Sequence, residues 1–266
     1  MTQDKYFAST EQEEIELERL RLLHQIFDPL TIENIENIGI SEGWTCLEVG
    51  AGAGSIASWM SDRVSLSGKV LATDIEMKFL SQLNKSNLEI RKHNIVNDDI
   101  EENSYDLVHC RFLLMHLNEY KKALNKMSSA LKPGGWLLIE ELDYTTYAAN
   151  DDNDPGVVFI NNYNKQRSDL LKEKGIVDPY FGRHVRSIID GLGLINVGSK
   201  GVTDTYRGGE TYARWNLATG RTAYQRNLEE NEDTFKAREY AILMNTDSSF
   251  YWTAPTFFSA WGRKLK

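Results

Sequence analysis

The stretch WTCLEVGAGAGS, from Trp44 to Ser55, decides the fold of this chain. It begins as an apolar segment containing the strand-favouring residues Leu47 and Val49, and it continues into glycines at positions 50, 52 and 54. Glycine permits a positive φ and leaves no Cβ between the backbone and a ligand. Residues 55–60 continue as a helix, whose free N-terminal amide groups face the space over the loop. The stretch therefore predicts a strand, a ligand-binding loop and a helix.

An acidic residue stands at the end of the next predicted strand, KVLATD at 69–74. Asp74 lies about 20 residues beyond the glycine loop, which is the spacing of a carboxylate that takes the hydroxyls of a ribose. Hydrogen bonds from two hydroxyls to one carboxylate contribute roughly 1.5–3 kcal/mol each, enough to select a nucleoside. The loop and the distal acid together predict a nucleoside cofactor.

The loop spacing indicates which kind of nucleoside. Dinucleotide loops follow GxGxxG, whereas these glycines follow GxGxG and Ser55 takes the third dinucleotide position. Glu48 comes directly before the loop segment, where its charge repels a pyrophosphate and attracts a cationic amino or sulfonium group. The pattern favours a cationic ligand over a diphosphate.

With four motifs in order, the chain resembles the class I S-adenosylmethionine-dependent methyltransferases. The motifs are EVGAGAG at 48–54, Asp74, the adenine-flanking segment His93-Asn94-Ile95, and LKPGGWLLI at 131–139. The resemblance covers about residues 40–143. The segments YFGRH at 180–184 and AWGR at 260–263 look like features of a bacterial small-molecule methyltransferase group.

The resemblance implies an α/β fold with a Rossmann-like sheet of seven mostly parallel strands, the last one antiparallel. It also implies an N-terminal helical lid at 1–40 and a cofactor-binding core at 41–150. The rest of the sheet falls in 151–266, with a helical, substrate-binding cap inserted before the last strand at about 205–250.

The resemblance further implies the cofactor-binding residues Glu48, Gly50, Ala51, Gly52, Gly54, Asp74, Ile75, Asn94, Ile95, Cys110 and Arg111. The cofactor is then S-adenosyl-L-methionine, and the product is S-adenosyl-L-homocysteine. Many relatives carry aspartate where this chain has Asn94, to receive a hydrogen bond from the adenine amino group. The amide oxygen accepts that bond without charge assistance, so we expect somewhat weaker cofactor binding.

Composition narrows the function classes. The 266 residues fit one large domain, or a domain with a lid, and 41% hydrophobic with 26% charged residues is ordinary for a soluble protein. A net charge of −9 opposes a nucleic-acid substrate, and no run approaches the ~20 apolar residues of a membrane span. We expect a cytoplasmic protein whose two cysteines, Cys46 and Cys110, are reduced and buried and bind no metal.

Local patterns place the remaining elements. Apolar residues at helical spacing follow a capping box at 10–13 and predict a helix that ends before Asp28-Pro29, with a second helix over 31–38. Strands and helices alternate from 44 to 142, including a helix over 76–84, which is typical of a parallel sheet. Residues 208–244 are predicted to be helical, and 256–262 to form the closing strand.

Two residues are candidate general bases. His116 precedes a predicted helix in a place where the resembled enzymes often carry histidine; the alternative is that it caps that helix or packs beneath the loop. Glu141 lies near the carboxyl end of the fifth strand, and Glu140 and Asp143 compete with it through strand alternation. A base is needed only when the acceptor must lose a proton, because proximity alone can supply much of the rate.

Aromatic residues gather after the core. We expect Tyr144, Tyr147, Tyr163, Tyr180 and Trp215 to bind the substrate, since aromatic walls suit a planar or apolar acceptor and attract a sulfonium cation. The alternative for many of these rings is simply to fill the core.

The predicted function is methyl transfer by in-line displacement to a small, partly aromatic or apolar metabolite such as a natural product. Alternatives are an NAD(P)-dependent oxidoreductase, a non-catalytic cofactor-binding subunit and a nucleic-acid methyltransferase. The acceptor and the methylated atom stay open, and a homodimer is possible.

Overall fold

The computed structural model describes residues 10–224 and 231–266, which divide into two compact units. The sheet unit comprises Leu30–Thr145, Ser168–Val202 and Pro255–Lys266. The aromatic unit comprises the chain up to Pro29, Thr146–Arg167 and Thr203–Ala254. The functional division expected at residues 40 and 150 stays a prediction, and the part of the expected lid before Thr10 lies outside the described residues.

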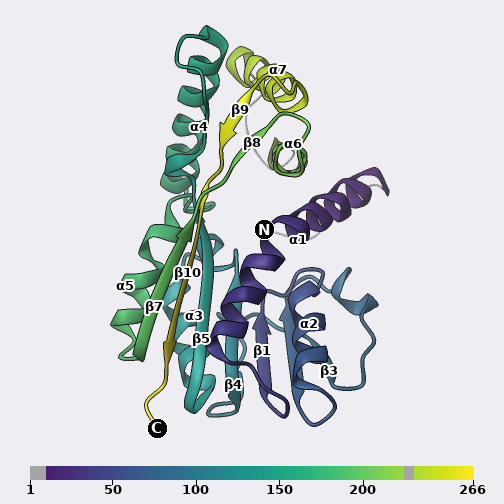
Figure 1. The fold of residues 1–266 in the computed structure, drawn as a ribbon, viewed down its shortest axis with the longest axis vertical. Helices are drawn as coiled ribbons and strands as arrows, with labels where there is room; N and C mark the ends of the chain where they lie inside the picture. Colours follow the sequence, from purple (N-terminus) through teal and green to yellow (C-terminus); the bar gives the residue numbers. More distant parts are fainter. Residues whose placement is uncertain (1–9, 225–230) are drawn as a thin grey trace. The chain divides into compact units, whose positions relative to one another are not determined.

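The sheet unit contains a seven-stranded sheet in the order β3-β2-β1-β4-β5-β10-β7 (Figure 1). Its strands are β1 (Thr45–Val49), β2 (Lys69–Asp74), β3 (Leu88–Lys92), β4 (Tyr105–Arg111), β5 (Leu131–Asp143), β7 (Ile195–Val202) and β10 (Thr256–Arg263). The first five strands are mutually parallel, whereas β10 is antiparallel to both of its neighbours. The predicted fold class is confirmed.

Helices cover both faces of this sheet. On one face, α2 (Ser55–Val64) and the part of α1 that belongs to the sheet unit bury Ile35, Ile56 and Met60 against the strands. On the other face, α3 (Tyr120–Ala130) and α5 (Val185–Gly191) bury Met127 and Ile189. Short 3-10 turns are η1 (Leu80–Gln82), η2 (Leu114–His116), η3 (Tyr144–Thr146) and η4 (Phe181–His184). The carboxyl ends of β1, β2 and β4 carry the loops that form the candidate site.

The predicted break before Asp28-Pro29 is wrong, because α1 runs unbroken from Thr10 to Ile38 with Pro29 inside it. Proline removes one helical hydrogen bond and crowds the carbonyl four residues earlier. Burial of apolar side chains before and after Pro29 offsets the cost of the proline. Phe27 is fully buried within the aromatic unit, and Ile35 is fully buried within the sheet unit. Tertiary packing therefore overrides the local signal.

The predicted helix over 76–84 is also wrong, since the structure contains only the single turn η1 there. Leu80 of this turn is fully buried, and a Cβ on Gly54 would lie only 2.8 Å from its Cδ1 atom. The segment packs against the glycine loop, and this contact replaces a regular helix.

The aromatic unit has a small sheet of its own in the order β6-β9-β8. Its elements are β6 (Ala148–Ala149), β8 (Thr205–Arg207), β9 (Tyr251–Thr253), α6 (Thr211–Tyr224), α7 (Glu232–Thr246) and the first part of α4 (Pro155–Glu173). Trp252 of β9 is fully buried and stacks on Tyr147 and Tyr206, at ring-centroid distances of 5.2 and 6.3 Å.

The expectation of one helical segment over 208–244 is wrong in detail. Residues 225–230 lie outside the described structure, and α7 begins anew where the Asn231 side chain accepts a hydrogen bond from the Thr234 N–H at 2.9 Å. The strands of the small sheet were missed because two or three residues are too few to establish a period. Among the helices described, none is long and apolar enough to cross a membrane.

Candidate functional site

The glycine loop between β1 and α2 has the backbone that its sequence predicts. Gly50, Gly52 and Gly54 have φ values of 74°, 57° and 78°, in the left-handed region that other residues rarely adopt. The N–H groups of Gly50 and Ala51 donate to the Thr73 carbonyl at 2.8 and 3.0 Å, which ties the loop to β2. The turn thus holds a stretch of backbone without Cβ atoms at the carboxyl edge of the sheet.

Asp74 lies at the end of β2 beside this loop. Its carboxylate accepts the Gly52 N–H at 2.8 Å and the Glu76 N–H at 2.9 Å. Burial raises the pKa of Asp74 above its ordinary value, and these two backbone hydrogen bonds oppose the rise. The next residue, Ile75, is 53% exposed, which leaves an apolar side chain open beside the acid.

The segment after β3 forms a tight turn. The Asn94 backbone N–H donates to Asp98 Oδ2 at 2.8 Å, and Asn94 Oδ1 accepts the Val96 N–H at 3.0 Å. The amide oxygen expected to receive the adenine amino group therefore already has one partner, and a second bond would use its other lone pair. Ile95, also expected at the cofactor, is buried in the core.

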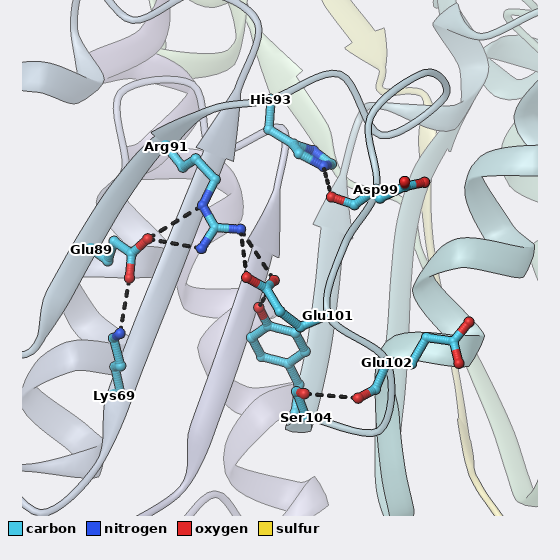
Figure 2. A network of polar contacts seen from close by, with 9 residues as sticks. Lys69, Glu89, Arg91, His93, Asp99, Glu101, Glu102 and Ser104 are labelled. Carbon is cyan, nitrogen blue, oxygen red and sulfur yellow. Dashed lines mark hydrogen bonds and ion pairs between the residues drawn. The ribbon is translucent and has the colours of Figure 1, made fainter.

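A polar network holds the connection between β3 and β4 in place (Figure 2). His93 Nε2 donates to the Asp99 carbonyl at 3.2 Å, and Arg91 donates to both carboxylate oxygens of Glu101 at 2.9 and 3.1 Å. The Tyr105 hydroxyl donates to the same carboxylate at 3.0 Å. These contacts fix both ends of the turn that carries Asn94.

A second polar network lies inside the sheet unit. His109 of β4 is fully buried between two carboxylates, with Nδ1 at 2.8 Å from Glu48 Oε2 and Nε2 at 3.2 Å from Glu140 Oε2. Glu48 is on β1 and Glu140 on β5, so the three side chains span three adjacent strands. This arrangement brings the predicted cofactor residue Glu48 together with His109, which the sequence did not single out as functional.

The far side of this network reaches α1 and β10. Glu140 accepts hydrogen bonds from Thr31 Oγ1 at 2.5 Å, Asn34 Nδ2 at 2.8 Å and Ser259 Oγ at 2.9 Å. Arg111, expected at the cofactor, donates from Nη1 to Thr31 Oγ1 at 2.8 Å. Glu140 was an alternative candidate base, and here it has four hydrogen-bonding neighbours.

The network changes proton affinities. Burial lowers the pKa of His109, but Glu48 and Glu140 outweigh it and raise that pKa to about 9. Burial raises the pKa of Glu140, but His109, Thr31 and Arg111 outweigh it and hold that pKa below its ordinary value. His109 is therefore an imidazolium at neutral pH.

Glu141 points to the opposite face of β5. The carboxyl group is fully buried, and Oε1 accepts the N–H groups of Leu113 and Leu114 at 3.0 and 2.6 Å. Oε2 has no hydrogen-bond partner among the residues described. Burial raises the pKa of Glu141 to about 8. Phe112, with a φ of 54°, makes the sharp turn after β4 that delivers these two N–H groups.

The other candidate bases occupy different surroundings. His116 is exposed at the end of η2. Asp143 forms a bidentate ion pair with Arg183, at 2.6 and 2.9 Å. Cys110 is fully buried, and burial together with Glu141 raises the pKa of its thiol. Only its backbone is thus placed to serve a ligand.

The predicted substrate residues fall in both units. Tyr144 and Tyr180 belong to the sheet unit, where the Tyr180 hydroxyl donates to Asp169 at 2.6 Å. Tyr147, Tyr163 and Trp215 belong to the aromatic unit. Each is therefore placed within its own unit, and their convergence on one acceptor stays a prediction.

The aromatic unit contains unsatisfied polar atoms. Trp215 packs edge-on against Phe27 and Tyr212, at ring-centroid distances of 5.4 and 5.6 Å. Its Nε1 atom, and the Thr219 hydroxyl one turn later on α6, are buried without a hydrogen-bond partner in the described part of the chain. Unsatisfied buried donors are costly, so they mark a place where a ligand group gains a hydrogen bond.

A surface pocket of about 550 Å³ also lies in the aromatic unit. It is lined by Gln25, Ile26, Asp204, Thr205, Tyr206, Gly209, Glu210, Thr211, Tyr212 and Arg214. Within residues 10–224 and 231–266, no cluster of three or more histidine, cysteine or acidic side chains is arranged to hold a metal.

Known proteins similar to this chain include methyltransferases. A family model described as a methyltransferase domain matches residues 47–139. Methyltransferase str3 of Strobilurus tenacellus is 26% identical over 178 residues, which cover 66% of this chain and 61% of that relative. The demethylmenaquinone methyltransferase of Oceanobacillus iheyensis is 29% identical over 121 residues, covering 43% of this chain and 51% of that enzyme. The chain thus matches only about half to three fifths of the length of these relatives.

The fold has solved counterparts. The crystal structure of a putative methyltransferase from Bacillus halodurans superposes with a TM-score of 0.55 at 15% identity, covering 88% of this chain and 98% of that one. At this identity, the likeness concerns the fold alone.

Proposed function

We propose that this chain is a class I S-adenosylmethionine-dependent methyltransferase and that it transfers a methyl group from S-adenosylmethionine to a small metabolite. The observation that carries the proposal is the carboxyl edge of β1 and β2. Glu48 lies on β1 and Asp74 ends the neighbouring strand β2. The glycine loop follows β1 and donates a hydrogen bond from Gly52 to the Asp74 carboxylate.

The residues present fit the cofactor. Glu48 Oε1 makes no hydrogen bond within the described residues, so it is available to an ammonium group. Asp74, held by Gly52 and Glu76, retains oxygen lone pairs for the ribose hydroxyls. Ile75 offers an exposed apolar surface for the adenine. The chemical group that the bound cofactor supplies is a methyl on a sulfonium.

The chain contributes mainly binding and orientation. Glu48, the loop glycines, Asp74, Ile75 and Asn94 would hold the cofactor, with the backbone at Cys110 and Arg111 at its amino-acid end, whereas the Ile95 side chain packs in the core behind them. Holding two reactants in attack geometry contributes several kcal/mol, by estimates of roughly 7–11 at best. A side chain that moves a proton is needed only for an acceptor that must ionise.

His116 and Glu141 remain the candidate bases. His116 is exposed at the tip of η2, so an acceptor can reach it. Glu141 is buried and holds the η2 backbone through Oε1, so it reaches an acceptor only if that turn moves. A pKa of about 8 for Glu141 suits proton transfer near neutral pH.

We assign recognition of the acceptor to aromatic side chains, with Trp215 and Tyr147 as its contacts in the aromatic unit. The unpartnered Nε1 of Trp215 supports an acceptor that carries an oxygen. The demethylmenaquinone methyltransferase among the relatives supports a quinone-like acceptor.

Radiolabelled methyl transfer tests the proposal. We expect label from S-adenosylmethionine to enter small phenols or quinols and not RNA. Trp215→Phe, which keeps an aromatic ring of smaller size and removes the N–H donor, should raise KM with little change in kcat. Trp44→Phe, just before the amino end of β1 in the sheet unit, is the matched control and should leave KM unchanged. Transfer to RNA alone, or equal effects of both variants, would contradict this assignment.

A further inference from the structure

The proposed function leaves His109 unexplained. The side chain is fully buried in the middle of a parallel sheet, yet both of its ring nitrogens lie within 3.2 Å of a carboxylate oxygen. Replacing such a group by an apolar one is often neutral for stability. The placement of one partner, Glu48, two residues before Gly50 of the cofactor loop points to a role beyond folding.

Glu48 is held from one side only. Its Oε2 atom bonds to His109 Nδ1 at 2.8 Å, which fixes the rotation of the carboxylate. Within the described residues no group donates to Oε1, and the side chain keeps 5% of its exposure. One oxygen is therefore anchored and the other is left for a ligand.

We propose that His109 is a positioning residue for the amino-acid end of the cofactor, bridging Glu48 and Glu140 so that Glu48 Oε2 is anchored and Oε1 is offered to the ligand ammonium. This inference rests on the proposed function.

The charges of the cluster support this role. An imidazolium placed between two buried carboxylates offsets their mutual repulsion. The Arg111 guanidinium, on Thr31, is the next charge along the network and lies on the side of Glu140.

Two carboxylates contact the His109 imidazole, and the remaining polar neighbours bond to Glu140. Glu48 faces it from β1 and Glu140 from β5, while Thr31 and Asn34 of α1 and Ser259 of β10 bond to Glu140. Among the described residues, the charged groups of this cluster are thus the two carboxylates and Arg111. Substitutions at Ser259 disturb the network without touching Glu48.

Two thioether ligands separate binding of the amino-acid end of the cofactor from binding of its adenosine. S-Adenosylhomocysteine carries the amino-acid end, whereas 5′-methylthioadenosine has the same adenosine and a methyl group in its place. For His109→Gln, which keeps a hydrogen-bond donor and removes the charge, we expect the dissociation constant of S-adenosylhomocysteine to rise about tenfold. The dissociation constant of 5′-methylthioadenosine should stay within about twofold. Calorimetric titration of the full chain measures both.

Ser259→Ala is the matched control. It removes a hydrogen bond to Glu140 and one from Asn34 but leaves His109 and Glu48 paired, so both ligands should bind as they do to the wild type. Equal losses for both ligands in His109→Gln would mean a merely structural role and would overturn the inference. Unchanged binding of both ligands would overturn it as well.

A second variant covers the case in which His109→Gln does not fold. Glu140→Gln keeps one acceptor oxygen, replaces the other by an NH2 donor and removes one carboxylate charge from the imidazole, so the His109 charge is lost at a lower pH. The pH at which the affinity for S-adenosylhomocysteine falls should then shift downward relative to the wild type, while 5′-methylthioadenosine shows no shift. Identical pH profiles would overturn the inference. A wild type that binds neither ligand would overturn the proposed function itself, and the inference with it.

Discussion

Glu141 gives the protein a stability that depends on pH in a direction opposite to that of most carboxylates. Its carboxyl group is fully buried, with two backbone N–H groups on Oε1 and none on Oε2. Burial raises its pKa from an ordinary 4.5 to about 8. Between these pH values the folded protein holds a proton that the unfolded chain has released, so the free energy of unfolding falls as the pH rises.

The magnitude follows from the same shift. Each tenfold change in proton affinity corresponds to about 1.4 kcal/mol, so the cost of ionising Glu141 reaches on the order of 4–5 kcal/mol above pH 8. Relaxation and water entry reduce this value, and we expect roughly 2–4 kcal/mol to be measured. The Glu141→Gln variant keeps an oxygen for the two N–H groups and cannot ionise, so it lacks this loss.

Urea unfolding at pH 5, 6, 7 and 8 tests the prediction. The free energy of unfolding of Glu141→Gln, relative to the wild type, should increase steadily across this range. Glu102→Gln is the control, because this glutamate is exposed in the loop before β4 and should show a constant difference (Figure 2). Parallel curves for Glu141→Gln and the wild type would refute the reasoning.

Two further predictions concern the glycine loop and the cysteines. Gly54→Ala adds a Cβ in contact with Leu83 at a φ of 78°, so we expect the free energy of unfolding in urea to fall by roughly 2–4 kcal/mol. Gly39→Ala is the control and should lower it by about 1 kcal/mol, because its φ is 95° but its Cβ meets no atom within 4 Å. Equal decreases for the two variants would contradict the packing argument. Cys46 and Cys110 are fully buried, and burial raises the pKa of both thiols. Neither thiol should therefore react with an aromatic disulfide reagent at pH 8 until denaturant is added. Reaction of either thiol in the native protein would contradict this prediction.

The features that the sequence predicted correctly are those that depend on residues close to one another in the chain. The glycine spacing between β1 and α2 and the acid at the end of β2 depend on neighbouring residues, and the structure places Asp74 beside Gly52 as the spacing predicts. The alternation of strands and helices likewise predicted a parallel sheet, and the resemblance predicted its antiparallel last strand; both are confirmed. Such features require only backbone conformation and residues close in the chain.

The buried network was missed because it depends on lateral pairing. Glu48, His109 and Glu140 are separated by 61 and 31 residues, and only the parallel register of β1, β4 and β5 brings them together. Polar residues within otherwise apolar strands were the available signal. The continuity of α1 through Pro29 was missed for a similar reason, since burial of Phe27 and Ile35 is not visible in a helical pattern alone.

Ligand titration of the wild-type protein tests the central claim most directly. S-Adenosylmethionine, S-adenosylhomocysteine and NADH are titrated in parallel by calorimetry, with Asp74→Asn as the companion variant. The account predicts dissociation constants on the order of micromolar for the two adenosyl ligands, much weaker binding to Asp74→Asn, and no binding of NADH. Binding of NADH alone, or unchanged affinity of Asp74→Asn for the adenosyl ligands, would contradict it.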